Sequence, residues 1–173
     1  MRHVHRWSSP SIALHWLGAL IIVGLAVVGS LMTDLAPESE TRRLMSRLHG
    51  IGGFALMVLT LLRLLMRKRG VPEEPLALPP IHRRGVGLVH VLLYGVVFSL
   101  GLSGAATGVM SGWPEYLQGT LAAVPSFENV PTREVHGVLV FALFGLVGLH
   151  VAGVIVQQIR RGGAIERMLP RGR

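Results

Sequence analysis

Four long apolar stretches run through this sequence, and they restrict its possible folds more than any other feature does. They cover residues 12–32, 48–66, 85–109 and 135–157. Each has roughly the 20 residues that a helix needs to cross the hydrocarbon core of a bilayer. Because lipid offers no hydrogen bonds to the backbone, a spanning apolar segment is expected to be helical. The sequence therefore predicts an all-α fold, an integral membrane four-helix bundle that forms a single membrane domain over residues 1–173.

The connections between these stretches carry an uneven charge, and this orients the predicted bundle. Twelve of the 17 Lys and Arg residues lie in residues 1–11, 67–84 and 158–173, whereas the connections at 33–47 and 110–134 hold four. Cytoplasmic loops of membrane proteins are enriched in Lys and Arg. Both termini and the connection between the second and third stretches are therefore expected in the cytoplasm. This topology accounts for the net charge of +8, so a nucleic-acid-binding function is not favoured.

The fourth stretch contains two histidines, His136 and His150, although it carries no Asp, Glu, Lys or Arg. They are 14 positions apart, which is about 21 Å along a helix axis and about 40° short of four full turns. Both imidazoles therefore leave the helix on nearly the same face, one toward each side of the membrane. Ionisable side chains at such depths are costly and usually mark a functional site.

Histidines in the first two stretches match these two depths. His15 lies early in the first stretch, on the predicted cytoplasmic side with His150, and His49 opens the second, on the periplasmic side with His136. The absence of cysteine excludes iron–sulfur clusters and covalently attached haem. Two histidine pairs at two depths suit two b-type haems, because each iron takes one imidazole on each face. We therefore expect His15 and His150 to ligate one haem iron, and His49 and His136 the other.

Roles without haem remain open for these histidines from the residues alone. A single histidine near a helix end is often an interfacial or hydrogen-bonded residue. A zinc site is not favoured because the two levels are far apart, and a carboxylate-bridged metal pair is excluded because the stretches contain no Asp or Glu. A haem-free transporter or assembly factor is the alternative of a different class, and it predicts a colourless preparation. Nearby glycines would admit a flat macrocycle or serve helix packing: Gly18, Gly50, Gly52, Gly53, Gly137, Gly148 and Gly153.

Seven short motifs accompany these histidines. They are HW at 15–16, HG at 49–50, LRLLMR at 62–67, HVLLY at 90–94, EVHG at 134–137, LH at 149–150 and RMLP at 167–170. In order and spacing they resemble the bacterial cytochrome b561 family over essentially the whole chain. The resemblance implies two heme b groups, a bacterial cell inner membrane location, and electron exchange with ubiquinone as substrate.

The resemblance also implies an enzyme class. One member of the family is a superoxide oxidase, so a superoxide:ubiquinone oxidoreductase is expected, with superoxide or another periplasmic electron donor as the partner. The alternative within electron transfer is a cytochrome b subunit that docks a dehydrogenase or hydrogenase and co-purifies with it. In either case electrons pass through haem, and no catalytic side chain is expected.

Two residues of the third stretch form a candidate quinone site. His90 and Tyr94 are four positions apart and so share a helix face, near the depth of His15 and His150. A histidine there could hydrogen-bond a quinone oxygen and supply a proton on reduction. The alternative is a buried His90 that is bonded to a backbone carbonyl or to a haem propionate.

Arginines near the two depths are candidates for contacts with haem propionates or with an anion. Arg6 and Arg63 are expected on the cytoplasmic side, and Arg47 and Arg133 on the periplasmic side. Periplasmic arginines would also attract a small anion such as superoxide. Arg63, which lies inside the second stretch, could instead extend to the membrane interface.

The segments outside the four stretches are expected to be a charged loop at 33–47, a proline-rich extended linker at 71–80, a loop at 112–131 and a basic tail at 160–173.

Overall fold

A computed structural model of the chain describes residues 6–69, 78–127 and 129–169. Its elements are α1 (Ser9–Thr33), α2 (Glu40–Arg69), α3 (Pro80–Ser111), α4 (Trp113–Gln118), α5 (Pro131–Arg161) and the short 3₁₀ helix η1 (Glu166–Met168). No strand occurs in these ranges. The helices α1, α2, α3 and α5 are long and apolar enough to cross a membrane. The predicted all-α fold with four spanning helices is therefore confirmed.

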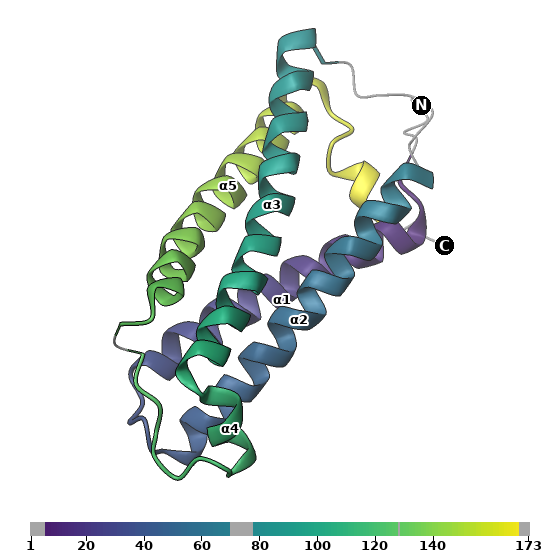
Figure 1. Cartoon of the computed structure of the whole chain (residues 1–173). Helices are drawn as coiled ribbons and strands as arrows, with labels where there is room; N and C mark the ends of the chain where they lie inside the picture. The colour runs from purple at the N-terminus through teal and green to yellow at the C-terminus, as the bar shows by residue number, and fades with distance from the viewer. Residues whose placement is uncertain (1–5, 70–77, 128, 170–173) are drawn as a thin grey trace.

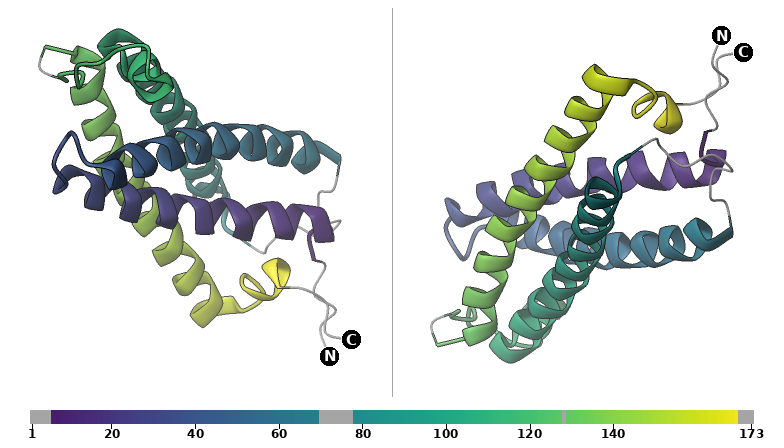
Figure 2. Two further views of the ribbon diagram at one scale, coloured as in Figure 1. Left: turned by 90° about the horizontal axis from the view of Figure 1, so that it is seen from below. Right: turned by 90° about the horizontal axis from the view of Figure 1, so that it is seen from above.

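The four long helices are arranged as two pairs. Helix α1 lies along α2, and α3 lies along α5, while α2 and α3 touch between the pairs. The pairs are inclined to each other, so α3 and α5 cross α1 and α2 obliquely (Figures 1 and 2). Helix α4 marks one end of the bundle, called here the α4 end. The residues after α5 mark the opposite end, called here the strap end.

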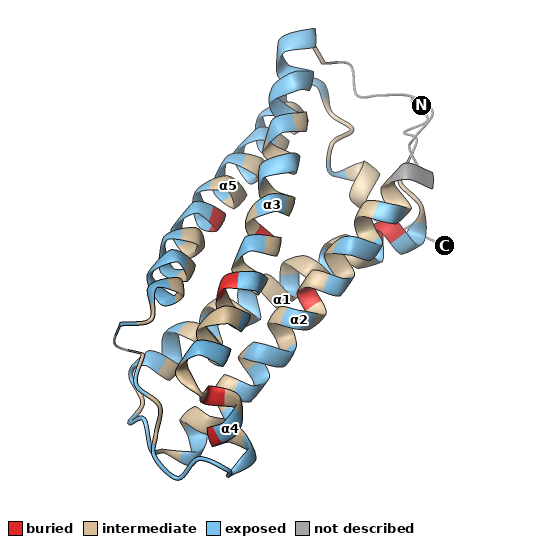
Figure 3. Cartoon of the chain, viewed as in Figure 1, coloured by how far each residue is buried: buried red, intermediate tan, exposed pale blue. Residues whose placement is uncertain are grey.

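Few side chains are buried within the bundle (Figure 3). Leu56 of α2, Val97 of α3 and Leu143 of α5 form its small core. Large apolar side chains lie instead on the outer surface, where Phe141 of α5 is 80% exposed. A surface of this kind would be unfavourable in water, whereas lipid tails are as apolar as the side chains themselves. The outer faces of the helices are therefore suited to lipid.

Helix α2 begins earlier than the sequence predicts. Residues 40–47, which are expected in a loop, form its first two turns. The Ser39 side-chain oxygen accepts a hydrogen bond from the backbone N–H of Arg42 at 3.2 Å, which is the geometry of a helix N-cap. The charged residues of this segment thus extend the helix beyond the apolar stretch. The predicted linker at 71–80 lies mostly outside the described residues, and Pro80 already belongs to α3.

The expected loop at 112–131 also contains a helix, α4. Gly112 ends α3 with φ 74° and Gly119 ends α4 with φ 78°, a backbone region that favours glycine. Trp113 and Tyr116 of α4 are buried. The Arg43 guanidinium lies 4.7 Å from the centre of the Tyr116 ring and donates to the Tyr116 carbonyl at 2.8 Å. Arg43 therefore attaches α4 to the beginning of α2.

Replacing Arg43 by methionine is expected to loosen α4. A hydrogen bond from a charged group contributes about 1.5–3 kcal/mol, so the loss should lower the thermal unfolding temperature. The emission of Trp113 should shift to the red, and it can be measured alone in a background variant in which Trp7 and Trp16 are replaced by phenylalanine. Arg43→Lys should fall between, because lysine keeps the charge but not the planar fork. Unchanged emission and unfolding temperature in Arg43→Met would show that this contact does not hold α4.

A short segment after α5, residues 162–169, is called here the C-terminal strap. The Gln158 side-chain oxygen accepts hydrogen bonds from the backbone N–H groups of Ala164 and Ile165, at 2.9 and 3.0 Å. The Trp16 indole N–H donates to the Met168 carbonyl at 2.7 Å. The strap therefore crosses from the end of α5 to the beginning of α1 (Figure 1). Part of the predicted basic tail is thus folded against the bundle.

Candidate functional site

The first histidine pair lies nearer the α4 end and joins α2 to α5. The ring centres of His49 and His136 are 6.3 Å apart, and the ring planes are inclined by 66°. An imidazole nitrogen bonds a metal ion at about 2 Å, so two imidazoles on opposite sides of one metal hold their centres about 6 Å apart. The observed separation therefore fits two axial ligands of one iron.

The second pair lies nearer the strap end and joins α1 to α5. The ring centres of His15 and His150 are also 6.3 Å apart, with an angle of 73° between the rings. Helix α5 thus contributes one histidine to each level, as the 14-residue spacing predicts. Each pair comes from two different helices, which is necessary for a porphyrin to stand between its ligands.

The hydrogen bonds of His136 leave its other nitrogen available to a metal. Its Nδ1 lies 3.1 Å from the Ser103 hydroxyl oxygen and 3.2 Å from the Leu100 carbonyl oxygen. A carbonyl only accepts, so Nδ1 carries the proton and donates it. The lone pair is then on Nε2, and a hydrogen bond on the remote nitrogen is what orients a metal-bound histidine. The sequence does not predict Ser103 in this role, because it is 33 positions from His136.

Replacing Ser103 by alanine is expected to weaken binding at this level without abolishing it. The Leu100 carbonyl still accepts from His136, but the hydroxyl contact is lost. Changes to residues that hydrogen-bond a metal ligand typically cost 10–100-fold in metal affinity, and we expect a loss near the lower limit, about 10-fold. Transfer of haem to excess apomyoglobin measures this loss. Ser99→Ala is the matched control, because Ser99 is exposed on the same helix. Equal transfer rates for the two variants would contradict the role of Ser103.

Two glycines pack directly on the rings of the first pair. A Cβ atom added to Gly29 of α1 would lie 3.2 Å from Cε1 of His49, and one added to Gly104 of α3 would lie 3.2 Å from Cε1 of His136. Both contacts are tighter than most real Cβ contacts. The positions of the two rings therefore depend on the missing side chains.

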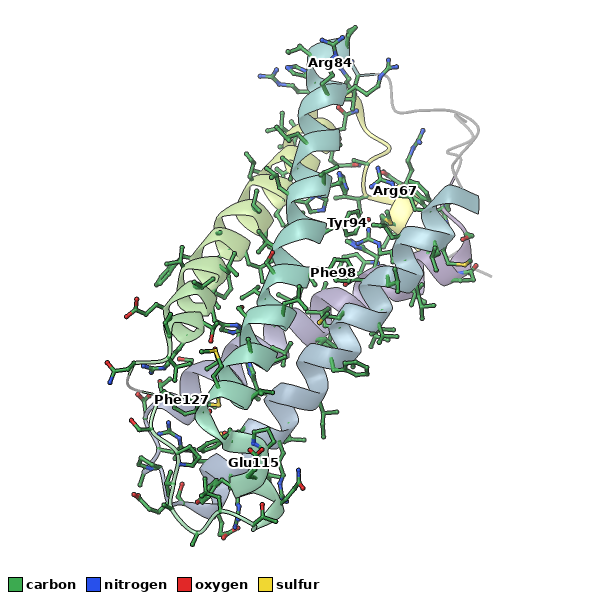
Figure 4. The ribbon with its side chains drawn as sticks, in the orientation of Figure 1. Arg67, Arg84, Tyr94, Phe98, Glu115 and Phe127 are labelled. Atoms are coloured by element: carbon green, nitrogen blue, oxygen red, sulfur yellow. The ribbon has the colours of Figure 1, made fainter. Side chains whose placement is uncertain are left out.

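The predicted quinone-site residues gather beside the second pair. His90 Nδ1 lies 2.7 Å from the Val86 carbonyl oxygen. His90 therefore makes the hydrogen bond to a backbone carbonyl that is the alternative to a role in quinone binding. Its ring centre is 5.1 Å from that of His150. The Tyr94 hydroxyl is buried and has no hydrogen-bond partner among the described residues. Tyr94 and Phe98 lie on the part of α3 that faces α2 (Figure 4).

Arg63 is the arginine nearest to this group. Its guanidinium is 6.0 Å from the centre of the Tyr94 ring, and its charge is within electrostatic reach of His15 and His150. Arg63 thus lies beside the second level, where it could contact a haem held by His15 and His150.

The other predicted arginines have partners outside the histidine pairs. The Arg47 guanidinium donates to the Leu117 carbonyl of α4, and the Arg133 guanidinium lies 5.8 Å from the centre of the Phe127 ring. Arg6 is within electrostatic reach of Glu166 in the strap. The pKa of the Glu166 carboxyl is lowered by hydrogen bonds from the Glu166 backbone and from the Gln158 side chain, and the charge of Arg6 adds to this effect.

The donor set fits a haem better than a bare metal ion. In the described ranges no three His, Asp or Glu side chains converge on a point where they could hold a metal ion. A structural zinc site uses four protein ligands, and a catalytic one uses three. Haem iron has four porphyrin nitrogens already, so two imidazoles complete its coordination. The glycine contacts and the bond on His136 Nδ1 agree with this use of the pairs.

Comparison with known families supports the same assignment. A family model described as prokaryotic cytochrome b561 matches residues 6–171, nearly the whole chain. The chain belongs to the prokaryotic cytochrome b561 family. A similar protein is cytochrome b561 homolog 2 of Escherichia coli (strain K12), which is 31% identical over 110 residues. That match covers 63% of this chain and 58% of the relative. No solved structure matches the chain.

Membership in the cytochrome b561 family indicates the general chemistry. The family consists of membrane cytochromes with b-type haem that transfer electrons. The histidines of the two levels are the described residues whose geometry suits axial ligation. The expected cytochrome b561 resemblance is therefore confirmed at the level of the family.

Proposed function

We propose that this protein is a diheme cytochrome of the bacterial inner membrane that oxidises superoxide and reduces ubiquinone. The observation that carries the proposal is the second histidine pair. A single haem would need two ligands, yet the structure holds two pairs with the same 6.3 Å separation at two depths of one bundle. Both pairs share α5, so they are arranged in series across the membrane.

Bound haem would supply one-electron redox chemistry, and the chain would supply its position. His49 and His136 would hold one haem near the α4 end, and His15 and His150 the other near the strap end. With both termini in the cytoplasm, as the basic residues predict, the α4 end faces the periplasm. The two haems would then connect the two sides of the membrane.

Ubiquinone would bind beside the second level, at His90 and Tyr94. The buried Tyr94 hydroxyl has no partner among the described residues, so it is available to donate to a quinone carbonyl oxygen. Since the Val86 carbonyl occupies His90 Nδ1, the other nitrogen of this ring, which lies beside the His150 ring, would be left to exchange a proton. Reduction of a quinone needs two protons as well as two electrons, and His90 would relay one of these protons.

Superoxide would approach at the α4 end, where arginines are held in fixed positions. Arg43 and Arg47 donate to backbone carbonyls of α4. A carbonyl has no net charge, so these bonds orient the guanidinium groups without neutralising them. Fixed positive charge raises the encounter rate of a small anion. Acidic residues such as Glu40, which lies 3.6 Å from Arg43, reduce this attraction locally.

Rapid mixing of superoxide with oxidised protein in ubiquinone-containing liposomes tests the proposal. Haem absorbance should show reduction within the mixing experiment, followed by ubiquinol formation, and superoxide dismutase should abolish both. Tyr94→Phe should slow ubiquinol formation while haem reduction continues. No haem reduction at several pH values would reject superoxide as the donor. Co-purification with a larger dehydrogenase or hydrogenase complex would favour a docking subunit instead.

A further inference from the structure

The C-terminal strap lies against the beginning of α1, next to a proposed haem ligand. Two hydrogen bonds hold it there: the Trp7 backbone N–H donates to the Arg167 carbonyl at 3.2 Å, and the Trp16 indole donates to the Met168 carbonyl at 2.7 Å. Trp16 follows His15 directly, and their ring centres are 5.3 Å apart. The backbone of Arg167 is therefore fixed close to the His15–His150 level.

The side chain of Arg167 has a buried hydrogen-bond donor without an acceptor among the described residues. Its Nε is buried and has no hydrogen-bond partner among the described residues. Buried polar atoms in proteins are nearly always hydrogen-bonded, so such an atom calls for an explanation. Nε is one of five donors on a planar, permanently charged group that matches a carboxylate. The missing partner is therefore expected to be an anionic acceptor.

Glu166, the neighbouring carboxylate, does not meet this requirement. Its Oε1 accepts from the Gln158 amide at 2.8 Å, and Arg6 is within electrostatic reach. The Glu166 Oε2 atom is buried and also lacks a hydrogen-bond partner, so Arg167 Nε does not donate to it. An acceptor from outside the described chain is needed for Arg167.

We propose that Arg167 binds a propionate carboxylate of the haem held between His15 and His150. The inference rests on the proposed two-haem function. A porphyrin at this level carries two carboxylates at one edge, and an unpaired charge at membrane depth is costly. Arg63 lies beside the two rings, and the strap brings Arg167 to the same end of the bundle. The strap thereby becomes part of the haem site.

Haem loss from an Arg167→Gln variant tests this role. A lost charge-assisted hydrogen bond corresponds to roughly 10- to 100-fold in affinity, so one of the two haems should pass to apomyoglobin about that much faster. Arg167→Lys should fall between, because it keeps the charge. Arg160→Gln is the matched control, since Arg160 is exposed in the last turn of α5 at the same end. Equal rates for Arg167→Gln and the wild type would overturn the inference.

Reconstitution with haem dimethyl ester separates a propionate contact from a merely structural one. Because the ester has no carboxylate charge, wild type and Arg167→Gln should then lose haem at similar rates. A difference that persists with the ester would overturn the inference, as would an Arg167→Lys variant as weak as Arg167→Gln. The haem content of the wild type is the separate test of the proposed function. Fewer than two haems would reject that function, whereas two haems with no effect at Arg167 would reject this inference alone.

Discussion

Replacing His49 by alanine is expected to lower the haem content from two haems to one per chain. The remaining haem should be the one at His15 and His150, because the two levels share no ligand. Replacing His150 should also leave one haem, held by His49 and His136. Pyridine haemochrome assays on detergent-purified protein give these numbers. His82→Ala is the control, since His82 is exposed in the first turn of α3 and belongs to neither pair.

A rescue experiment distinguishes a lost ligand from a lost fold. Imidazole added to a His49→Gly variant should restore the second haem, because a free imidazole can occupy the space of the missing ring. Two haems in His49→Ala would show that the level is not built on His49. A content of one haem in His82→Ala would show that haem loss is not specific to the paired histidines. No haem in any preparation grown with ample haem supply would reject axial ligation by these histidines.

Valine at Gly104 or Gly29 is expected to displace one haem although neither residue could bind iron. The added atoms would meet the ring of His136 or His49, because a Cβ alone already approaches within 3.2 Å. Overpacking of this kind costs about 1–3 kcal/mol, which corresponds to roughly 5–150-fold faster haem loss. Alanine at the same positions should give a smaller effect. Electron paramagnetic resonance should show the low-spin signal of one haem weakened or converted to high spin.

Gly108 and Gly24 provide matched controls for this prediction. Gly108 lies one turn beyond Gly104 on α3, and Gly24 lies on α1 with Gly29. A Cβ atom at either control position meets nothing within 4 Å. Gly108→Val and Gly24→Val should therefore keep both haems. Equal losses in all four valine variants would mean that helix packing in general, and not contact with the histidine rings, determines haem retention.

The spacing and charge of the sequence are sufficient to predict which histidines lie at the same depth. The period of a helix places His136 and His150 on one face, and the distribution of Lys and Arg assigns His15 and His49 to opposite ends. Both inferences depend only on positions along single helices. The structure then brings each predicted pair to the same separation of 6.3 Å.

Contacts between helices are beyond the reach of such reasoning. The sequence points to glycines beside the histidines along the chain, such as Gly50 and Gly137, where an added Cβ meets nothing within 4 Å. The glycines that touch the rings are Gly29 and Gly104, each on a different helix from the histidine it contacts. Which residues meet across helices depends on the crossing angle and the rotation of each helix. Neither quantity follows from spacing within one helix.

The short helix α4 escapes prediction for a related reason. Its six residues are too few for a periodic pattern, and it is held by Arg43, which is 73 positions from Tyr116. In the sequence the same arginine is only one of three positive charges in the connection at 33–47. Side-chain periodicity cannot predict a long-range contact to a backbone carbonyl, because every residue carries a carbonyl.

Helix α5 carries one histidine of each proposed haem level and has no proline between them. A continuous helix is stiff, so α5 would fix the distance between the irons of the two proposed haems. The rate of electron tunnelling falls steeply with distance, and motions of α1, α2 or α3 would leave the spacing along α5 unchanged. Lengthening α5 by one residue between His136 and His150 would turn one of the two histidines by about 100° and point it away from its partner. The number of residues between these two histidines would thus set the distance that an electron crosses between the two proposed haems.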